Sequence, residues 1–331
     1  MPDSSSVTAG EPVRAPAHAA GIFALLCMAR ALLATAADAP SYAASVGYNV
    51  NTFSSHFDSS TVDLQRSGKN TYQWYPWQLF GHRANPDAIT LNPDGSVTLQ
   101  GDTTGPNGEI TTAAPAHDGA GFVGTAFGGG AYIEAVFRFD PADVARQNSK
   151  GWPSFWSLAA EGSVLQGANQ WPGQPSGFQH QIEADFFEYL LLPYHERPNA
   201  YGASMHDWYG IRNITCKGLC QQGMPPSIGK RLAPPDIDFT QYHRYGFLWV
   251  PATGAHMGYA RFYLDGKPVG PDQQWTSFTG QAPPPTGQNW AFGILDQQHL
   301  VLILGTGVGE PMTVRSVNVW QNSTSQNLHF P

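Results

Sequence analysis

Three carboxylates stand within six residues of this chain, at Glu183, Asp185 and Glu188. The other members of the segment EADFFE, residues 183–188, are alanine and phenylalanine. Because charged side chains are costly on a half-buried strand, such a cluster needs a chemical reason. Two carboxyl groups facing one glycosidic bond are what glycoside hydrolysis requires. The alternative is a strand whose acidic face is only solvated.

Residues 181–189 predict a β-strand, because apolar and acidic side chains alternate along them. Glu183 and Asp185 share one face, whereas strict alternation would point Glu188 to the other. A single-residue bulge near Phe187 would return Glu188 to the face of the other acids. Positions four strand steps apart are roughly 13 Å apart, whereas a retaining glycosidase needs its carboxyl groups about 5–5.5 Å apart. Glycoside hydrolysis therefore predicts a bulged and curved strand here.

The motifs around these acids resemble glycoside hydrolase family 16, whose bulged branch carries the signature E-x-D-x-x-E. His206 stands where that branch has a strand-borne histidine. Other segments are similar to family motifs and follow the family's order: 130–137 (GAYIEAVF) to GYFEARF, 151–158 (GWPSFWSL) to GWPAFWLL, 243–249 (HRYGFLW) to FHTYGIEW, 262–266 (FYLDG) to FYVDG, and 296–304 (DQ, then LIL) to FDQPFYLILN. The resemblance covers about residues 50–321. It favours an active site over a merely solvated acidic face.

The resemblance implies that Glu183 is the nucleophile and that Glu188 is the general acid, then the general base. Asp185 would hydrogen-bond Glu183 and help to set its charge state. Three like charges this close do not all ionise easily, so one pKa rises and a protonated acid is available near neutral pH. His206 would hydrogen-bond Glu188 or the leaving sugar, with a structural histidine as the alternative.

The chain has 10 tryptophans and 13 tyrosines, whose rings can stack on the C–H faces of sugars. Trp152, Trp156 and Trp171 are candidate substrate-binding platforms. The alternative for each of them is packing in the core or in a loop.

Composition and turn signals predict an all-β chain. Charged residues make up 13% of the 331 positions, while 36 glycines and 27 prolines fit a loop-rich protein. Residues 133–139 and 312–320 alternate as strands do, and Asp265-Gly266 is a two-residue hairpin signal. We expect residues 45–331 to form a two-sheet antiparallel β-sandwich, a jelly roll with a concave substrate cleft. The net charge of −8, without a basic block, argues against nucleic acid and anionic membranes as partners.

Residues 1–39 predict a secretory leader, since residues 22–29 are mostly apolar and an alanine-rich stretch follows them. The apolar run is too short to span a bilayer, so no membrane span is expected. A low-complexity tail is the alternative. With a leader, the protein would be secreted or periplasmic, and we expect a monomer whose partner is a polysaccharide.

The cysteine count agrees with export. Cys27 would leave with the leader, and Cys216 and Cys220 would remain as a pair. A disulfide between them would pin the loop after His206, although so short a loop stabilises little. A zinc site is the alternative, but a second pair of ligands is lacking.

No cofactor or catalytic metal is expected. The family's closing strand carries an aspartate that binds a structural calcium, and Arg315 stands in its place, which makes this calcium doubtful. These observations together predict a retaining endo-glycosidase acting on a β-linked polysaccharide, foremost β-1,3-glucan. Galactan hydrolysis and transglycosylation are alternatives on the same fold. The rival from another class is a lectin-like protein that binds carbohydrate without turnover.

Overall fold

The structure is a computed structural model, which describes residues 38–77, 84–101, 107–117, 119, 121–146, 151–163, 175–189, 200–224, 231–234, 236–278, 289–305 and 311–331. Almost all of the predicted leader, residues 1–39, lies outside this range, and so does Trp171. Among the described residues, no helix combines the length and apolar character that a membrane crossing requires.

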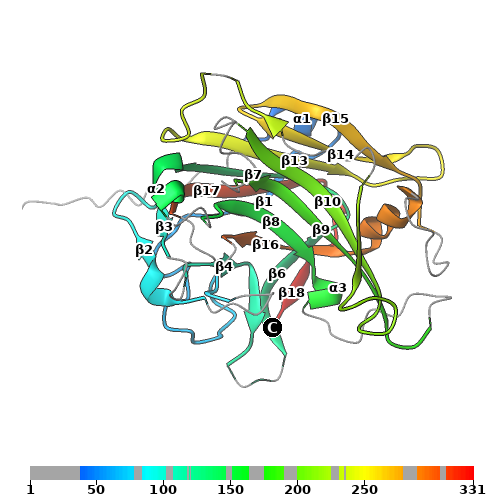
Figure 1. The fold of residues 1–331 in the computed structure, drawn as a ribbon, viewed down its shortest axis with the longest axis horizontal. Helices are drawn as coiled ribbons and strands as arrows, with labels where there is room; N and C mark the ends of the chain where they lie inside the picture. The colour runs from blue at the N-terminus through cyan, green and yellow to red at the C-terminus, as the bar shows by residue number, and fades with distance from the viewer. Residues whose placement is uncertain are drawn as a thin grey trace, which may run out of the picture. The chain divides into compact units, whose positions relative to one another are not determined.

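In the part of the chain that the structure describes, two antiparallel sheets form a β-sandwich (Figure 1). The first sheet has eight strands among these described residues. Seven follow one another in the order β15 (Lys267–Trp275), β14 (Gly258–Leu264), β13 (His243–Val250), β7 (Ala131–Phe139), β17 (Met312–Gln321), β3 (Val97–Leu99) and β2 (Ile89–Leu91), while β1 (Val50–Ser54) pairs with β17.

The second sheet, with ten strands among the described residues, carries the acidic segment. Its main order is β11 (Cys220–Gly223), β10 (Ala200–Ile211), β9 (Phe178–Glu188), β8 (Ser154–Ala159), β16 (His299–Leu304), β6 (Phe122–Gly128) and β18 (Leu328–Phe330). Three short strands pair alongside: β12 (Arg231–Leu232) with β10, β4 (Ile110–Thr111) with β16, and β5 (Ala113–Pro115) with β6. The helical segments among the described residues are short: α1 (Ser41–Ala44), α2 (Pro141–Arg146), α3 (Ala160–Ser163) and the 3-10 segments η1 (Pro86–Ala88) and η2 (Asn289–Gln297). The prediction of an all-β sandwich is thereby confirmed.

Large apolar side chains fill the space between the two sheets. On β7, Ile133, Ala135 and Phe137 all belong to the main core cluster, as the period-two pattern predicts. Phe137 meets Phe187 of the other sheet edge to face, with ring centroids 5.0 Å apart. Such aromatic contacts between the inner faces fix the two sheets against one another.

The hairpin predicted at Asp265-Gly266 joins β14 to β15. Asp265 has φ 50° and Gly266 has φ 77°, the two positive values that a type I′ turn requires. The Asp265-Gly266 sequence therefore accounts for the turn between β14 and β15.

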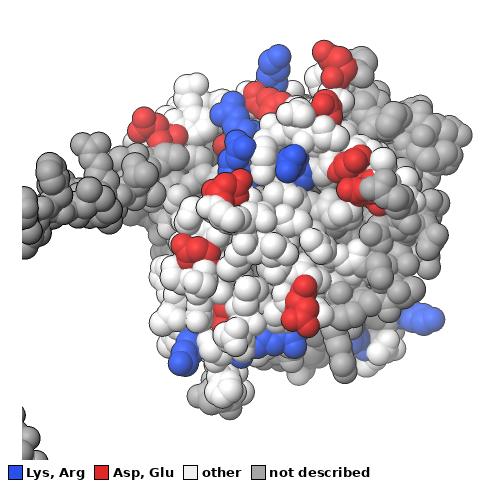
Figure 2. Space-filling view, turned by 90° about the vertical axis from the view of Figure 1, so that its left-hand side faces the viewer, with Lys and Arg blue, Asp and Glu red and all other residues white. Residues whose placement is uncertain are grey.

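Charged side chains are interspersed by sign on the face seen in Figure 2, where Lys and Arg lie among Asp and Glu. Arg315 lies over the ring of Tyr242, with its guanidinium carbon 3.7 Å from the ring centroid. A cationic side chain with an aromatic partner does not fit a calcium ligand, so these residues do not support the structural calcium of family 16.

Candidate active site

A β-bulge in β9 brings the three acids to one face of the sheet. On β10, Gly202, Ser204 and His206 pair with Glu188, Asp185 and Glu183. Because these three β10 residues are two positions apart, they lie on one face of the sheet, and so do the acids opposite them.

The extra residue of the bulge lies where the sequence predicted it. The register of β9 shifts against β10 between Gly202 and Ser204, and against β8 between Phe155 and Trp156. Phe186 and Phe187 consequently both enter the core cluster, although they are neighbours in sequence. The predicted bulge is confirmed, and its physical consequence is that Glu188 avoids the core.

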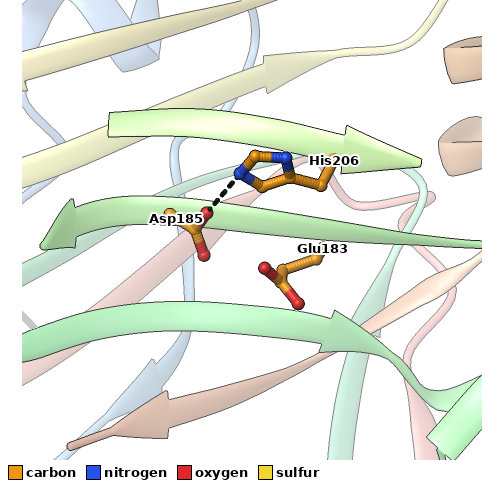
Figure 3. Close-up of side chains that lie close together, drawn as sticks. All are labelled: Glu183, Asp185 and His206. Carbon is orange, nitrogen blue, oxygen red and sulfur yellow. Dashed lines mark ion pairs between the residues drawn. The ribbon is translucent and has the colours of Figure 1, made fainter. Parts of the chain in front are cut away.

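Glu183, Asp185 and His206 form a compact polar group on β9 and β10 (Figure 3). One ligand-type atom from each lies within 4.8 Å of the others. His206 Nε2 is 3.2 Å from Asp185 Oδ2, and the Ser204 hydroxyl contacts both atoms, at 3.2 Å from Asp185 Oδ2 and 3.0 Å from His206 Nε2. Asp185 is thus linked to His206 directly and through the Ser204 hydroxyl.

An indole N–H contacts each glutamate. Trp208 Nε1 donates to Glu183 Oε2 at 3.1 Å, and Trp152 Nε1 donates to Glu188 Oε1 at 3.1 Å. Trp208 comes from β10, two positions after His206 on the same face, whereas Trp152 lies just before β8. The two glutamates therefore receive these hydrogen bonds from opposite sides of β9, Glu183 from β10 and Glu188 from the residues just before β8.

Burial raises the pKa of all three carboxyl groups. For Glu183 the charge on Asp185 and, to a smaller extent, the charge on Glu188 raise the pKa further, while His206 and the Trp208 hydrogen bond lower it. For Glu188, burial and Asp185 raise the pKa to about 8, against smaller lowering effects of His206 and Trp152. The hydrogen bond from Ser204 partly offsets the effect of burial on the pKa of Asp185. The three groups therefore keep at least one proton between them near neutral pH.

The same three side chains, Glu183, Asp185 and His206, have a spacing that a metal ion could also accept. Hydrogen bonds already engage them, from Ser204 to Asp185 and from Trp208 to Glu183. We interpret the group as paired carboxyl groups with their hydrogen-bond partners and assign no ion to it.

The predicted tryptophan platforms have different surroundings. Trp152 is half-buried and contacts Glu188, so it belongs to the site. Trp156 is 7% exposed, packs with Leu158 and Ile303, and donates its indole N–H to the Gly305 carbonyl at 2.8 Å. Trp156 also pairs with Asp185 and therefore lies on the face of the sheet that carries the acids, while Trp171 lies outside the described residues. Sugar binding by any of the three stays a prediction.

Cys216 and Cys220 form a disulfide, with their Cα atoms 5.3 Å apart. It lies at the end of the β10–β11 hairpin, where Tyr209 pairs with Cys220. In the same hairpin His206 pairs with Gly223 and Trp208 with Gln221. The disulfide therefore closes a small loop within the connection between β10 and β11, and β10 carries His206 and Trp208 of the site.

Sequence reasoning missed Ser204 and Trp208. A usable signal was present, because both lie two positions from His206, and side chains two apart on a strand share a face. Because His206 stands where the family has a strand-borne histidine, alternation along that strand already places Ser204 and Trp208 beside it. That Trp208 reaches Glu183 depends on the pairing of β9 with β10, which the sequence does not show.

No protein-family model and no curated protein matches this sequence. Among solved structures, the chain is similar to an endo-1,3-beta-glucanase from Streptomyces sioyaensis, with 18% identity, coverage of 89% of this chain and 100% of that chain, and a TM-score of 0.48. It is also similar to beta-agarase A in complex with oligoagarose, at 13% identity, 84% and 91% coverage, and a TM-score of 0.48. The exoplasmic/lumenal domain of VIP36, solved with Ca2+/Man3GlcNAc bound, matches at 12% identity, 74% and 84% coverage, and a TM-score of 0.31. We draw the functional conclusion from the site itself.

Proposed function

We propose that this protein is a retaining glycoside hydrolase that cleaves β-linked polysaccharide. The observation that carries the proposal is the bulge that places Glu188 on the face of Glu183 and Asp185. A solvated acidic strand has no need to displace one residue so that a third acid joins the other two. Two carboxyl groups on one face, with a proton retained near neutral pH, suit acid and nucleophilic catalysis.

In the first step, a Glu183 carboxylate oxygen forms a bond to the anomeric carbon while the bond from that carbon to the leaving oxygen breaks. The electron pair of the broken bond goes to the leaving oxygen, which takes the proton of Glu188. In the second step, Glu188 takes a proton from water, and the water oxygen replaces Glu183 on the anomeric carbon. Glu183 leaves as a carboxylate and Glu188 ends protonated, so the site is restored.

Asp185 and His206 adjust the pKa values of Glu183 and Glu188, and with them the protonation states that the two steps require. The negative charge of Asp185 raises the pKa of both glutamates, which keeps a proton available for the leaving group. His206 lowers both pKa values and is itself paired with Asp185 at 3.2 Å. The half-buried His206 also lies beside Glu183 across the strand pair, in reach of a bound sugar.

The finer terms of the proposal rest on the resemblance to family 16. They are endo-cleavage, β-1,3-glucan as the foremost substrate, and action as a secreted or periplasmic monomer after removal of a leader at about residue 39. Galactan and transglycosylation are outcomes that the same assay would detect.

The decisive experiment measures the reducing ends released from a panel of β-glucans and galactans by wild type and by Glu183→Ala. We expect release from at least one β-linked polymer by wild type, none by Glu183→Ala, and retention of anomeric configuration by proton NMR. The lectin-like alternative would be established if wild type bound these polymers without releasing reducing ends and Glu183→Ala bound them equally well. Inversion of configuration would reject the double-displacement mechanism.

A further inference from the structure

Each glutamate of the site accepts a hydrogen bond from a different tryptophan. Trp208 Nε1 lies 3.1 Å from Glu183 Oε2, and Trp152 Nε1 lies 3.1 Å from Glu188 Oε1. The two bonds are alike in donor, acceptor type and length. The two bonds differ only in the carboxyl group that accepts them. Removing one hydrogen bond therefore serves as the matched control for removing the other.

An indole N–H only donates, and it neither gains nor loses a proton in the working range of an enzyme. Its hydrogen bond therefore favours the ionised form of a carboxyl group over the protonated form. This matters most for a nucleophile, which reacts only as the carboxylate. For an acid, which reacts only when protonated, the same bond works against the active form.

The surroundings of Glu183 otherwise oppose ionisation. Burial, Asp185 and Glu188 all raise its pKa. The groups facing Glu183 across the sheet are Leu158 on β8, which carries no charge, and His206 on β10. Among the described neighbours, the groups that favour the Glu183 carboxylate are thus His206, through its charge, and Trp208, through the hydrogen bond that its uncharged N–H donates.

We propose that Trp208 is a positioning residue that holds Glu183 as a carboxylate and orients it for attack. This inference rests on the proposed function, because it assigns Glu183 the nucleophilic role. The N–H of Trp208 binds Oε2 and so restricts rotation of the carboxyl group, which leaves the second oxygen to bond the anomeric carbon. When the glycosyl ester breaks in the second step, the returning negative charge on Glu183 is again met by the same donor.

The test compares Trp208→Phe with Trp152→Phe by two readouts. The first is carboxyl-carbon NMR on protein labelled at glutamate, with the Glu183 signal identified by its loss in Glu183→Gln. Trp208→Phe should raise the titration midpoint of the Glu183 signal, and Trp152→Phe should instead raise that of Glu188. An unchanged Glu183 midpoint in a folded Trp208→Phe protein would overturn the inference.

The second readout is the pH profile of kcat/KM on the polysaccharide cleaved by wild type. Trp208→Phe should lower kcat about 10- to 100-fold, the range expected for loss of a hydrogen bond to a charged group, and should move the acidic limb of the profile to higher pH. Trp152→Phe should move only the basic limb. A fall in activity with an unmoved acidic limb, or a higher KM at unchanged kcat, would mean that Trp208 packs or binds sugar and would reject the inference.

A second substitution guards against misfolding. Incorporation of 3-benzothienylalanine at position 208 keeps the shape of the indole but replaces its N–H with sulfur, and it should reproduce the NMR and pH effects of Trp208→Phe. If wild type releases no sugar from any polymer, the proposed function fails, while the NMR shift still decides whether Trp208 controls the charge of Glu183.

Discussion

Glu183 and Glu188 lie on the same face of β9 although five positions separate them, an odd spacing that a regular strand would split between two faces. The bulge at Phe186 and Phe187 resolves the conflict by turning two successive aromatic side chains into the core. Phe186 stacks on Phe247 with centroids 4.6 Å apart, and Phe187 stacks on Tyr201 at 4.9 Å. Aromatic burial therefore stabilises the irregularity that assembles the acids.

Glu188→Ala should separate substrates by their leaving groups. Cleavage of the polysaccharide is expected to fall about 10²- to 10⁴-fold, because a sugar oxygen leaves slowly without a proton donor. A nitrophenyl glycoside should lose far less, since nitrophenolate leaves without protonation. Steady-state rates on both substrates check this, with Glu183→Ala, which should lose both activities, as the control. An equal fall on the two substrates in Glu188→Ala would refute the acid role.

Glu188→Gln should make the folded protein more stable at alkaline pH. The pKa of Glu188 is raised to about 8 in the fold, mainly by burial, against about 4.3 in an unfolded chain. The folded state therefore binds the proton more tightly, so stability is present at low pH and is lost as pH rises toward 8. Glutamine removes this loss, which two pKa values this far apart put at up to about 5 kcal/mol above pH 8 and close to zero at pH 4.

Thermal unfolding at pH 4, 6 and 9 measures this difference. Asp236→Asn, at an exposed aspartate, is the matched control and should show no comparable rise at pH 9. A stability gain of Glu188→Gln that is the same at all three pH values would contradict the expectation.

Asp296→Ala should destabilise the fold through two buried indoles. Trp249 and Trp275 each donate an indole N–H to Asp296 at 2.9 Å, and the backbone N–H of Ala252 donates at 2.8 Å. Both tryptophans are fully buried, so alanine would leave their donors without this acceptor and cost about 3–5 kcal/mol. Urea unfolding checks the change, and exposed Asp236→Ala should stay within about 0.5 kcal/mol of wild type. If Asp296→Ala also changed the free energy of unfolding by no more than about 0.5 kcal/mol, the two tryptophans would have found other acceptors.

Replacing Cys216 and Cys220 by serine should have a modest effect. The disulfide joins residues only four positions apart, and closing so short a loop is worth about 2 kcal/mol. The hairpin pairs of His206 and Trp208 do not depend on it, so polysaccharide cleavage at 25 °C should persist. Unfolding and activity measured on the same double variant check both statements. Loss of activity at unchanged stability would mean that the disulfide shapes the site directly.

Local patterns in the sequence determined a strand, a hairpin and a bulge of this protein. Alternation predicted the strand of the acids, Asp265-Gly266 predicted its hairpin, and the odd spacing of Glu188 demanded a bulge near Phe187. Each of these depends on neighbours along the chain, because strand periodicity, turn dihedrals and face assignment are properties of a few consecutive residues.

Tertiary structure alone decided which side chains meet. Trp208 contacts Glu183 because β10 pairs with β9 in one register, and Trp152 contacts Glu188 because β8 flanks β9 on its other side. Trp156, a candidate platform in the sequence, packs beside Leu158 and Ile303 because β8 pairs with β16 in one register. Strand order and register arise from contacts between distant segments, so composition and spacing could identify the acids but not their partners.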